Sequence, residues 1–200
     1  MNNYQLQQKQ ISELKGRPQL LIHICCGVCS VYPLYYLRQY FRITILYTNS
    51  NIYPYEEFQR RLDALKQYLD YLNDKQIRLI VDTYDNEAYQ QEVLPYADEP
   101  EGGKRCYLCY EIRMRRTFEY ARAHHYDYCT SVMSISNRKN AEWINQIGEK
   151  LEKQYQPVCY LHADFKKNGG ITRNEQMNRE LDLYHQNYCG CIYSQRNIKS

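Results

Sequence analysis

Nine cysteines, gathered mainly into three short clusters, are the residues of this sequence whose types and spacing could do chemistry. The clusters are Cys25-Cys26-Gly27-Val28-Cys29, Cys106-Tyr107-Leu108-Cys109 and Cys189-Gly190-Cys191. Nine in 200 residues are too few for a disulfide scaffold, which takes about 8–10% of a short chain. Residues 1–15 are rich in Gln and Asn, with no apolar segment that would predict secretion. Clustered cysteines in such a chain are typical of metal, redox or catalytic groups.

Four of these cysteines, Cys25, Cys26, Cys106 and Cys109, could form one Cys₄ site. The i, i+3 spacing of Cys106 and Cys109 puts both thiols on one face of a helix, and a CxxC turn would also converge them. A Cys₄ set suits either structural zinc or a [4Fe–4S] cluster, so the residues leave the metal open. Structural cysteines are the alternative for either pair.

The pair Cys189 and Cys191 has a different chemistry, because only Gly190 separates the two thiols. A disulfide between them would close a small, strained ring that is easily reduced. The same two thiolates could instead bind a metal. Cys129 and Cys159 lie inside apolar segments, and we expect both in the core.

Strands alternate with helices along the chain, which predicts an α/β, Rossmann-like, doubly wound parallel sheet of about five strands in a three-layer sandwich. The predicted strands are residues 20–24, 42–47, 77–81, 126–132 and 157–161. The predicted helices are residues 31–40, 56–72, 87–96, 106–123, 140–155 and 172–184. We expect one catalytic domain over residues 1–200, with a polar extension at 1–18, either a short helix or frayed, and an aperiodic tail at 187–200.

These elements decide where the cysteines meet. A strand order of 3-2-1-4-5 would open a crevice between strands one and four, at the carboxyl edge where ligands bind in such sheets. The Cys25 turn and residues 133–136 would line that crevice together. Ser30 is expected to cap the helix that follows the turn. His23 is expected to be a core histidine, and Asp164 either a helix cap or a substrate or metal contact.

The composition limits the classes of partner. A net charge of +3 is far below that of a histone-like protein, so any nucleic-acid contact needs a local patch. The 23 tyrosines could stack on bases, although an AT-rich genome enriches tyrosine as well. No apolar run approaches the ~18–20 residues of a membrane span, and we expect a cytoplasmic protein.

Six segments together resemble the cobalamin-independent epoxyqueuosine reductases, in the same order and over nearly the whole chain. They are HICCGVCS, YTNSNIYPYEEFQRRL, EGGKRCYLCYEIRMRRT, TSVMSISNRKNAEWINQIGEKL, ADFKKNGGITRN and HQNYCGCIYS. The resemblance implies a nucleotide-hydrolase-like α/β fold and an enzyme that reduces the epoxide of epoxyqueuosine, at the wobble position of tRNA, to queuosine. That reaction would be the last step of queuosine biosynthesis.

The resemblance also implies a [4Fe–4S] cluster and an iron site beside it. The family's cluster ligands match Cys25, Cys26, Cys106 and Cys109, and its redox-active pair matches Cys189 and Cys191. Family members carry Cys or Asp where this chain has Cys29, so its role stays open. Cys29, Cys189 and Cys191 are either ligands of a second mononuclear iron or, for the last two, a disulfide relay.

The implied reaction agrees with the residues. Turning an epoxide into an alkene takes two electrons and releases the oxygen as water. The epoxide oxygen needs an electrophile that no obvious side chain provides, which favours a second metal over a pure relay. The electrons would come from an external donor.

The implied partner is a tRNA anticodon loop, whose phosphates and splayed bases are bound by cations and aromatic rings. The candidate RNA-binding cations are Arg113, Arg115, Arg116, Arg138, Lys139, Lys166 and Lys167. Two alternatives belong to other classes. A zinc-stapled RNA- or nucleotide-binding module would lack catalysis. An ATP-dependent tRNA-thiolating enzyme would need a Ser/Gly-rich loop that CCGVCS does not supply.

Overall fold

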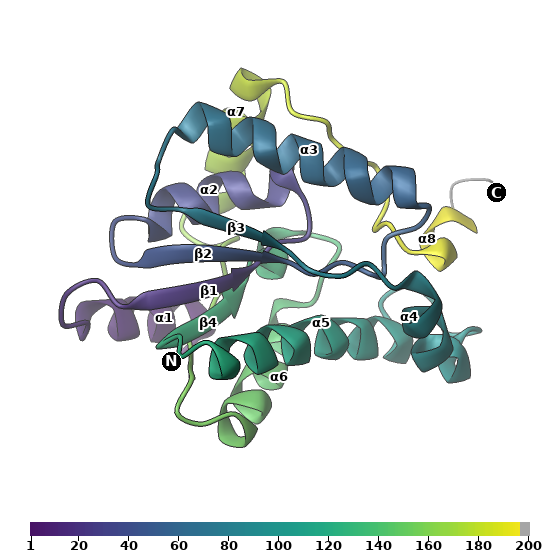
Figure 1. Cartoon of the computed structure of the whole chain (residues 1–200), viewed down its shortest axis with the longest axis horizontal. Coiled ribbons are helices and arrows are strands. Elements are labelled where there is room, and N and C mark those ends of the chain that lie inside the picture. The colour runs from purple at the N-terminus through teal and green to yellow at the C-terminus, as the bar shows by residue number, and fades with distance from the viewer. Residues whose placement is uncertain (197–200) are drawn as a thin grey trace.

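The sheet has five parallel strands, as the sequence predicts, and their order is β3-β2-β1-β4-β5. The computed structural model describes residues 1–196, so the last four residues of the predicted tail lie outside it. Helices cover both faces, with α2, α3 and α7 on one side and α5 and α6 on the other (Figure 1). The predicted Rossmann-like three-layer sandwich is confirmed.

The bounds of the elements are as follows. The strands are β1 (Gln19–His23), β2 (Arg42–Tyr47), β3 (Arg78–Val81), β4 (Tyr128–Ser131) and β5 (Cys159–Tyr160). The helices are α1 (Asn3–Ser12), α2 (Gly27–Leu37), α3 (Tyr55–Leu72), α4 (Asn86–Val93), α5 (Lys104–Ala123), α6 (Ala141–Gln154), α7 (Gly170–Leu181) and α8 (Ile192–Arg196). Two 3₁₀ turns are η1 (Leu94–Tyr96) and η2 (Val132–Ile135). None of the helices in the described part of the chain is long and apolar enough to cross a membrane.

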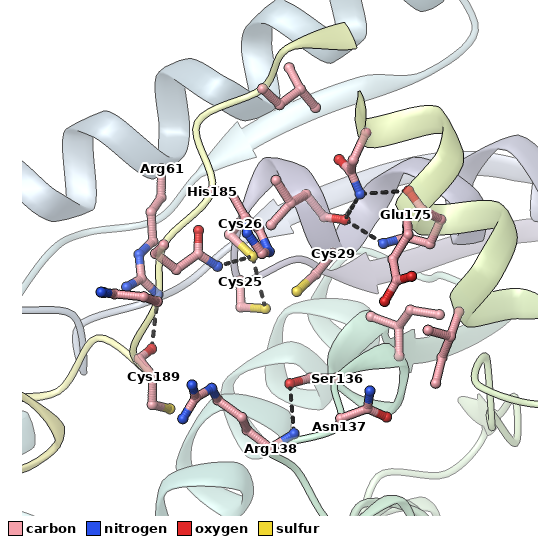
Figure 2. A pocket seen from close by; sticks show the side chains of 18 of the residues that line it. Cys25, Cys26, Cys29, Arg61, Ser136, Asn137, Arg138, Glu175, His185 and Cys189 are labelled. Carbon is pink, nitrogen blue, oxygen red and sulfur yellow. Dashed lines mark hydrogen bonds between the residues drawn. The ribbon is translucent and has the colours of Figure 1, made fainter. Parts of the chain in front are cut away.

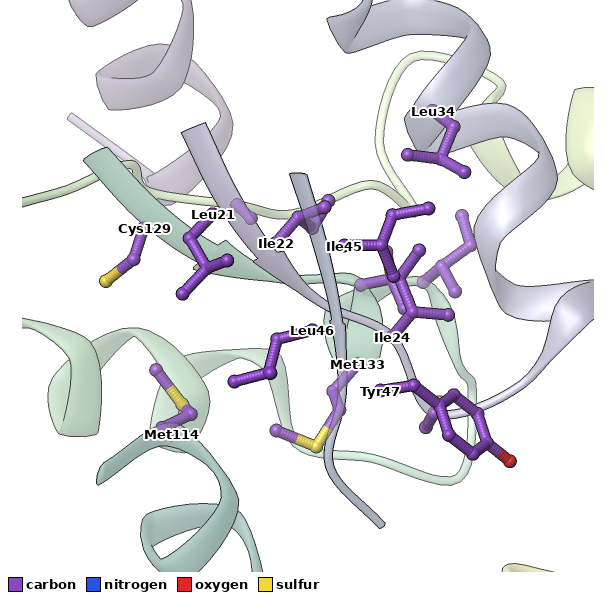
Figure 3. Packing of buried hydrophobic residues seen from close by; sticks show 14 of the residues in the cluster. Leu21, Ile22, Ile24, Leu34, Ile45, Leu46, Tyr47, Met114, Cys129 and Met133 are labelled. Carbon is purple, nitrogen blue, oxygen red and sulfur yellow. The ribbon is translucent and has the colours of Figure 1, made fainter. Parts of the chain in front are cut away.

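The core lies on both faces of β1 and β2, which explains why these strands are apolar without alternation. Figure 3 shows Leu21 and Leu46 on the side of Met114, and Ile22 and Ile45 on the side of α2. The side chains of Leu21, Ile22, Ile45 and Leu46 are all fully buried. β1 is the central strand, between β2 and β4, so the Cys25 turn that follows β1 starts from a strand that is fixed on both edges.

The largest departure from the predicted elements is at the start of α2, which begins at Gly27 and not at residue 31. Ser30 is therefore inside the helix, where its hydroxyl donates to the Gly27 carbonyl at 2.6 Å. Cys26 occupies the N-cap position with extended backbone. A Cβ on Gly27 would lie 2.6 Å from the Ala64 carbonyl carbon, so only glycine allows α2 to approach the backbone of α3 this closely.

Helices lie near both ends of the described part of the chain, and the sequence predicted only the first of them, as one of two alternatives. A capping box between Asn2 and Gln5 begins α1, so residues 1–18 include an ordered helix. The Gln10 amide of that helix donates to the Tyr160 carbonyl at 2.7 Å. At the other end, α8 follows the Cys189-Gly190-Cys191 motif, where no helix was predicted.

Candidate metal and redox site

The Cys25 turn brings three thiols together at the carboxyl edge of β1. The sulfurs of Cys25, Cys26 and Cys29 all lie within 4.8 Å of one another, with Cys25 and Cys26 buried. β1 ends at His23, so the backbone has left the strand before the two adjacent cysteines, and they can face the same space. Cys29 joins them because it lies in the first turn of α2 (Figure 2).

The three thiols share their protons unequally. Hydrogen bonds from Cys26 and Cys29 hold the pKa of Cys25 well below its usual value, despite burial. The hydrogen bond to Cys25 raises the pKa of Cys26 to about 12, and that of Cys29 also lies well above its usual value. Burial alone would lower the pKa of Lys139, but the nearby charges of Cys25 and Cys189 raise it. The turn therefore favours one thiolate, with a cation beside it.

The second thiol group joins the start of α5 to the C-terminal tail. Cys106 and Cys109 lie in the first two turns of α5, and the Gly102 amide donates to the Cys106 sulfur at 3.2 Å. Cys191 packs with Cys109 and Tyr89 in a small apolar cluster. Burial raises the pKa values of Cys106 and Cys109, and the charge of Cys189 raises them further. The tail thiols therefore lie beside the CxxC pair.

Cys189 also lines the same pocket as the Cys25 turn, so the tail folds back over the carboxyl edge. Among the described residues, only Cys25, Cys26 and Cys29 form a group of three metal-ligand atoms within 4.8 Å. The structure does not bring Cys106 or Cys109 into that group. Seven thiols nevertheless surround one region of the molecule, and soft thiolates are the donors that iron–sulfur clusters, zinc and iron take. The donor set fits such a metal.

The pocket has a volume of about 760 Å³ and opens between β1 and β4, where the predicted crevice lies. Its walls come from the Cys25 turn, the loop after η2, α7 and the segment 182–189 (Figure 2). Of the residues 133–136 expected to line it, Ile135 and Ser136 do so, whereas Met133 and Ser134 are buried in the core. Its size is within the range of about 300–1,000 Å³ for pockets that hold a small molecule.

Two asparagines of α7 hold the thiol turn in place and were missed by the sequence analysis. The side-chain amides of Asn174 and Asn178 each donate to the Val28 carbonyl at 2.9 Å. The Asn174 amide oxygen accepts from the Tyr32 amide at 3.1 Å. Their spacing of four is a weak sequence signal, because any exposed helix face shows it.

The seven candidate RNA-binding cations separate into three groups. Arg113 is only 3% exposed, and its Nε donates to the Cys109 carbonyl at 3.1 Å, so it is not available on the surface to RNA. Arg115 pairs with Glu92 and Arg116 with Asp82, at 2.7 Å each, on the outer face of α5.

Of the remaining four, Lys139 is half-buried and lines the pocket. Arg138 is exposed and lines the pocket, and Lys167 is exposed nearby in the sequence. The Lys166 ammonium donates to the Ser136 and Lys139 carbonyls, at 3.3 and 3.2 Å. Lys166 therefore also supports the loop that lines the pocket.

The remaining candidates have structural surroundings. His23 is fully buried with its Nδ1 2.8 Å from the Ser131 hydroxyl, and burial lowers its pKa to about 4, as for a core histidine. Asp164 does not cap a helix, because α7 begins at Gly170 after Gly169. Cys129 is buried as expected, but Cys159 is half-buried, because β5 is only two residues long and lies at the edge of the sheet.

Comparison with known proteins agrees with this arrangement. A family model described as epoxyqueuosine reductase QueH matches residues 20–197. The epoxyqueuosine reductase QueH of Streptococcus pyogenes serotype M1 is 39% identical over 181 residues, which are 89% of this chain and 71% of that protein. The one from Staphylococcus aureus is 38% identical, over 89% of this chain and 76% of that protein. This chain therefore belongs to the epoxyqueuosine reductase QueH family.

Proposed function

We propose that this chain is an oxidoreductase that converts epoxyqueuosine in tRNA to queuosine. The epoxide takes up two electrons and two protons, its oxygen leaves as water, and an alkene remains. One observation carries the proposal: in this QueH-family chain the Cys25 turn and Cys189 line one pocket at the carboxyl edge, and Cys191 of the tail packs against Cys109 of the CxxC pair. Epoxide reduction uses both buried metal ligands and a pair of thiols separated by one residue. A zinc-stapled RNA-binding module would need only the metal ligands.

We propose that Cys25, Cys26, Cys106 and Cys109 hold a [4Fe–4S] cluster. When bound, such a cluster supplies electrons one at a time, and a second iron supplies a Lewis acid. Three of these thiols are buried, and all four lie at or near the N-terminus of α2 or α5. The partial positive charge of a helix N-terminus favours thiolate over thiol.

The role of Cys29, Cys189 and Cys191 divides the mechanism into two hypotheses. As ligands of a second mononuclear iron, they would hold the group that binds the epoxide oxygen. As a relay, Cys189 and Cys191 would give up two electrons and two protons to become a disulfide, which the external donor then reduces. The proximity of the Cys29 and Cys25 sulfurs, and the position of Cys189 across the same pocket, support the first hypothesis.

The pocket suits one flipped-out nucleoside of a single-stranded loop. Its volume of about 760 Å³ accepts a modified base with its sugar, and α7 offers amide and carboxylate groups along one wall. Arg138 and Lys139 line the pocket as well, where they would meet RNA phosphates. We expect the enzyme to act in the cytoplasm on tRNA anticodon loops, with an external electron donor.

The test is to purify the protein without oxygen and to measure iron, sulfide and zinc together with turnover. Dithionite-reduced protein should convert epoxyqueuosine in tRNA to queuosine, as measured by mass spectrometry of the digested nucleosides. A colourless zinc protein that binds tRNA but forms no queuosine would contradict the proposal and support a zinc-stapled RNA-binding module.

The two hypotheses for the tail thiols are separated by iron content and a single turnover. If Cys29, Cys189 and Cys191 hold a second iron, each of Cys29→Ala, Cys189→Ser and Cys191→Ser should lose about one iron per chain and the first turnover. A pure relay predicts full iron and a normal first turnover in reduced protein, with later turnovers lost.

A further inference from the structure

The buried cation Arg61 of α3 contacts the Cys189-Gly190-Cys191 turn directly. Arg61 is not part of any of the three cysteine clusters. Its side chain is only 3% exposed. Nη1 donates to the Cys189 carbonyl at 2.8 Å, and Nη2 donates to the Tyr188 carbonyl at 3.3 Å (Figure 2 shows Arg61 and Cys189). One rigid guanidinium therefore fixes two consecutive peptide groups immediately before Gly190.

Arg61 is itself held in place from the opposite side. Its Nε donates to the Glu57 carboxylate at 2.6 Å, in an ion pair that is nearly excluded from water. The Tyr184 hydroxyl donates to the same carboxylate at 2.9 Å. Glu57 thus orients the guanidinium, and a lysine could not reproduce the arrangement, because an ammonium lacks the planar fork.

The backbone at Gly190 packs closely against the Arg61 guanidinium, with no room for a side chain. Its φ of +115° favours glycine, and a Cβ at this position would lie 2.8 Å from Arg61 Nη1. Its carbonyl accepts from the Tyr53 amide at 2.8 Å, and its amide donates to the Ser194 hydroxyl at 3.1 Å. The turn between the two cysteines is therefore packed flat against the guanidinium.

We propose that Arg61 is a positioning residue for the thiol pair: by fixing the carbonyls that precede Gly190, it holds Cys189 at the pocket and Cys191 beside Cys109. The proposal rests on the proposed function, in which those two thiols take part in the reduction. Arg61 also lines the pocket beside Cys26 and Cys189, so it sets the position of the tail relative to the Cys25 turn.

The first test is hydrogen exchange of the backbone amides in residues 187–195, which needs no substrate. Because Arg61→Gln alone would leave the Glu57 carboxylate buried and without its cation, the variant to use is Glu57→Gln/Arg61→Gln, which removes both charges. We expect exchange in this segment to be at least tenfold faster than in the unmodified protein. Glu57→Gln alone keeps the guanidinium but loses the carboxylate that orients it, so it should speed exchange by a smaller factor than the double variant.

Two further variants test whether faster exchange comes from the lost contact with the guanidinium or from a general loss of stability. Arg60→Gln removes a neighbouring cation of α3 that stacks on Tyr184 at 3.7 Å but does not contact the turn, and it should leave the exchange unchanged. Gly190→Ala keeps every charge but pushes the turn away from Arg61, and it should speed exchange like the double variant. Equal exchange in all variants, with the fold intact by circular dichroism, would overturn the proposal.

The second test measures kcat and KM separately for the same variants. Loss of the guanidinium should lower kcat at least tenfold and raise KM by a much smaller factor, because Arg138 and Lys139, which would meet the RNA phosphates, are unchanged. A change confined to KM would overturn a positioning role. If the unmodified enzyme forms no queuosine while the exchange pattern is as expected, the proposed function fails and the contact between Arg61 and the tail stands.

Discussion

Replacing Gly27 by alanine is expected to separate the thiol turn from α3 and to release bound iron. The new Cβ would lie 2.6–2.8 Å from three backbone atoms of Ala64 and Leu65, whereas ordinary contact begins at 3.4 Å. Backbone cannot rotate away as a side chain can, so the start of α2 must move by up to about 0.8 Å. Such overpacking costs about 1–3 kcal/mol in the free energy of unfolding. In a chain of 200 residues, 2 kcal/mol corresponds to a Tm about 4–8 °C lower.

A displacement of nearly 1 Å at a reacting centre costs on the order of 10²-fold in rate, so the loss of turnover should exceed the loss of stability. The assay combines urea unfolding with iron content and queuosine formation. The matched control is Gly148→Ala, whose Cβ would lie 2.3 Å from the Tyr160 ring, far along the chain from every thiol cluster. Gly148→Ala should lower stability but keep its iron. Equal iron content and equal rates in the two variants would refute the reasoning.

Three further predictions concern other residues of the site. Cys26→Ala should lower bound iron and sulfide, whereas Cys129→Ala should keep both and cost about 1–3 kcal/mol of core packing in urea unfolding. Burial alone would raise the pKa of Asp82, but the hydrogen bonds from Arg116 outweigh burial, and the pKa lies below its usual value. The Asp82 carboxylate therefore adds stability above about pH 4, and this stability is lost as the pH falls. Arg116→Gln should therefore cost about 0.5–1 kcal/mol at pH 7 and progressively less as the pH falls below about 4, by urea unfolding at a series of pH values. Arg138→Gln should flatten the slope of log K for tRNA against log salt by about 0.7, while Arg116→Gln leaves that slope unchanged; the reverse result would place the RNA on the outer face of α5.

The parallel sheet could be predicted because strands alternate with helices along the chain, and such sheets have few topologies. The strand order itself could not be derived, and the position of the crevice followed only for the order 3-2-1-4-5. The apolar run of β1 and the cysteines that follow it are adjacent in the sequence, so their meeting at the carboxyl edge is a local matter. The convergence of Cys189 on the Cys25 turn came from the resemblance of the motifs, because no periodicity in the tail indicates it.

Other features depended on contacts that a single sequence does not display. The early start of α2 depends on the fit of Gly27 against α3, which is a property of two helices. The burial of Arg113 is similar, because arginine on a helix ordinarily faces water and only the neighbouring elements decide otherwise. Arg61 lies in a segment that reads as an amphipathic helix, and its charge gave no indication that the side chain points inward.

The pairing of β1 with β4 has a consequence for how the protein refolds. It joins Leu21 to Cys129, and the contact between Gln186 and the Cys26 sulfur spans 160 positions. Contacts between such distant residues form slowly, since the intervening chain must first be closed into a loop. Until they form, nine free thiols are open to oxygen and to one another. Recovery from denaturant should therefore depend on the exclusion of air far more than on the concentration of the protein.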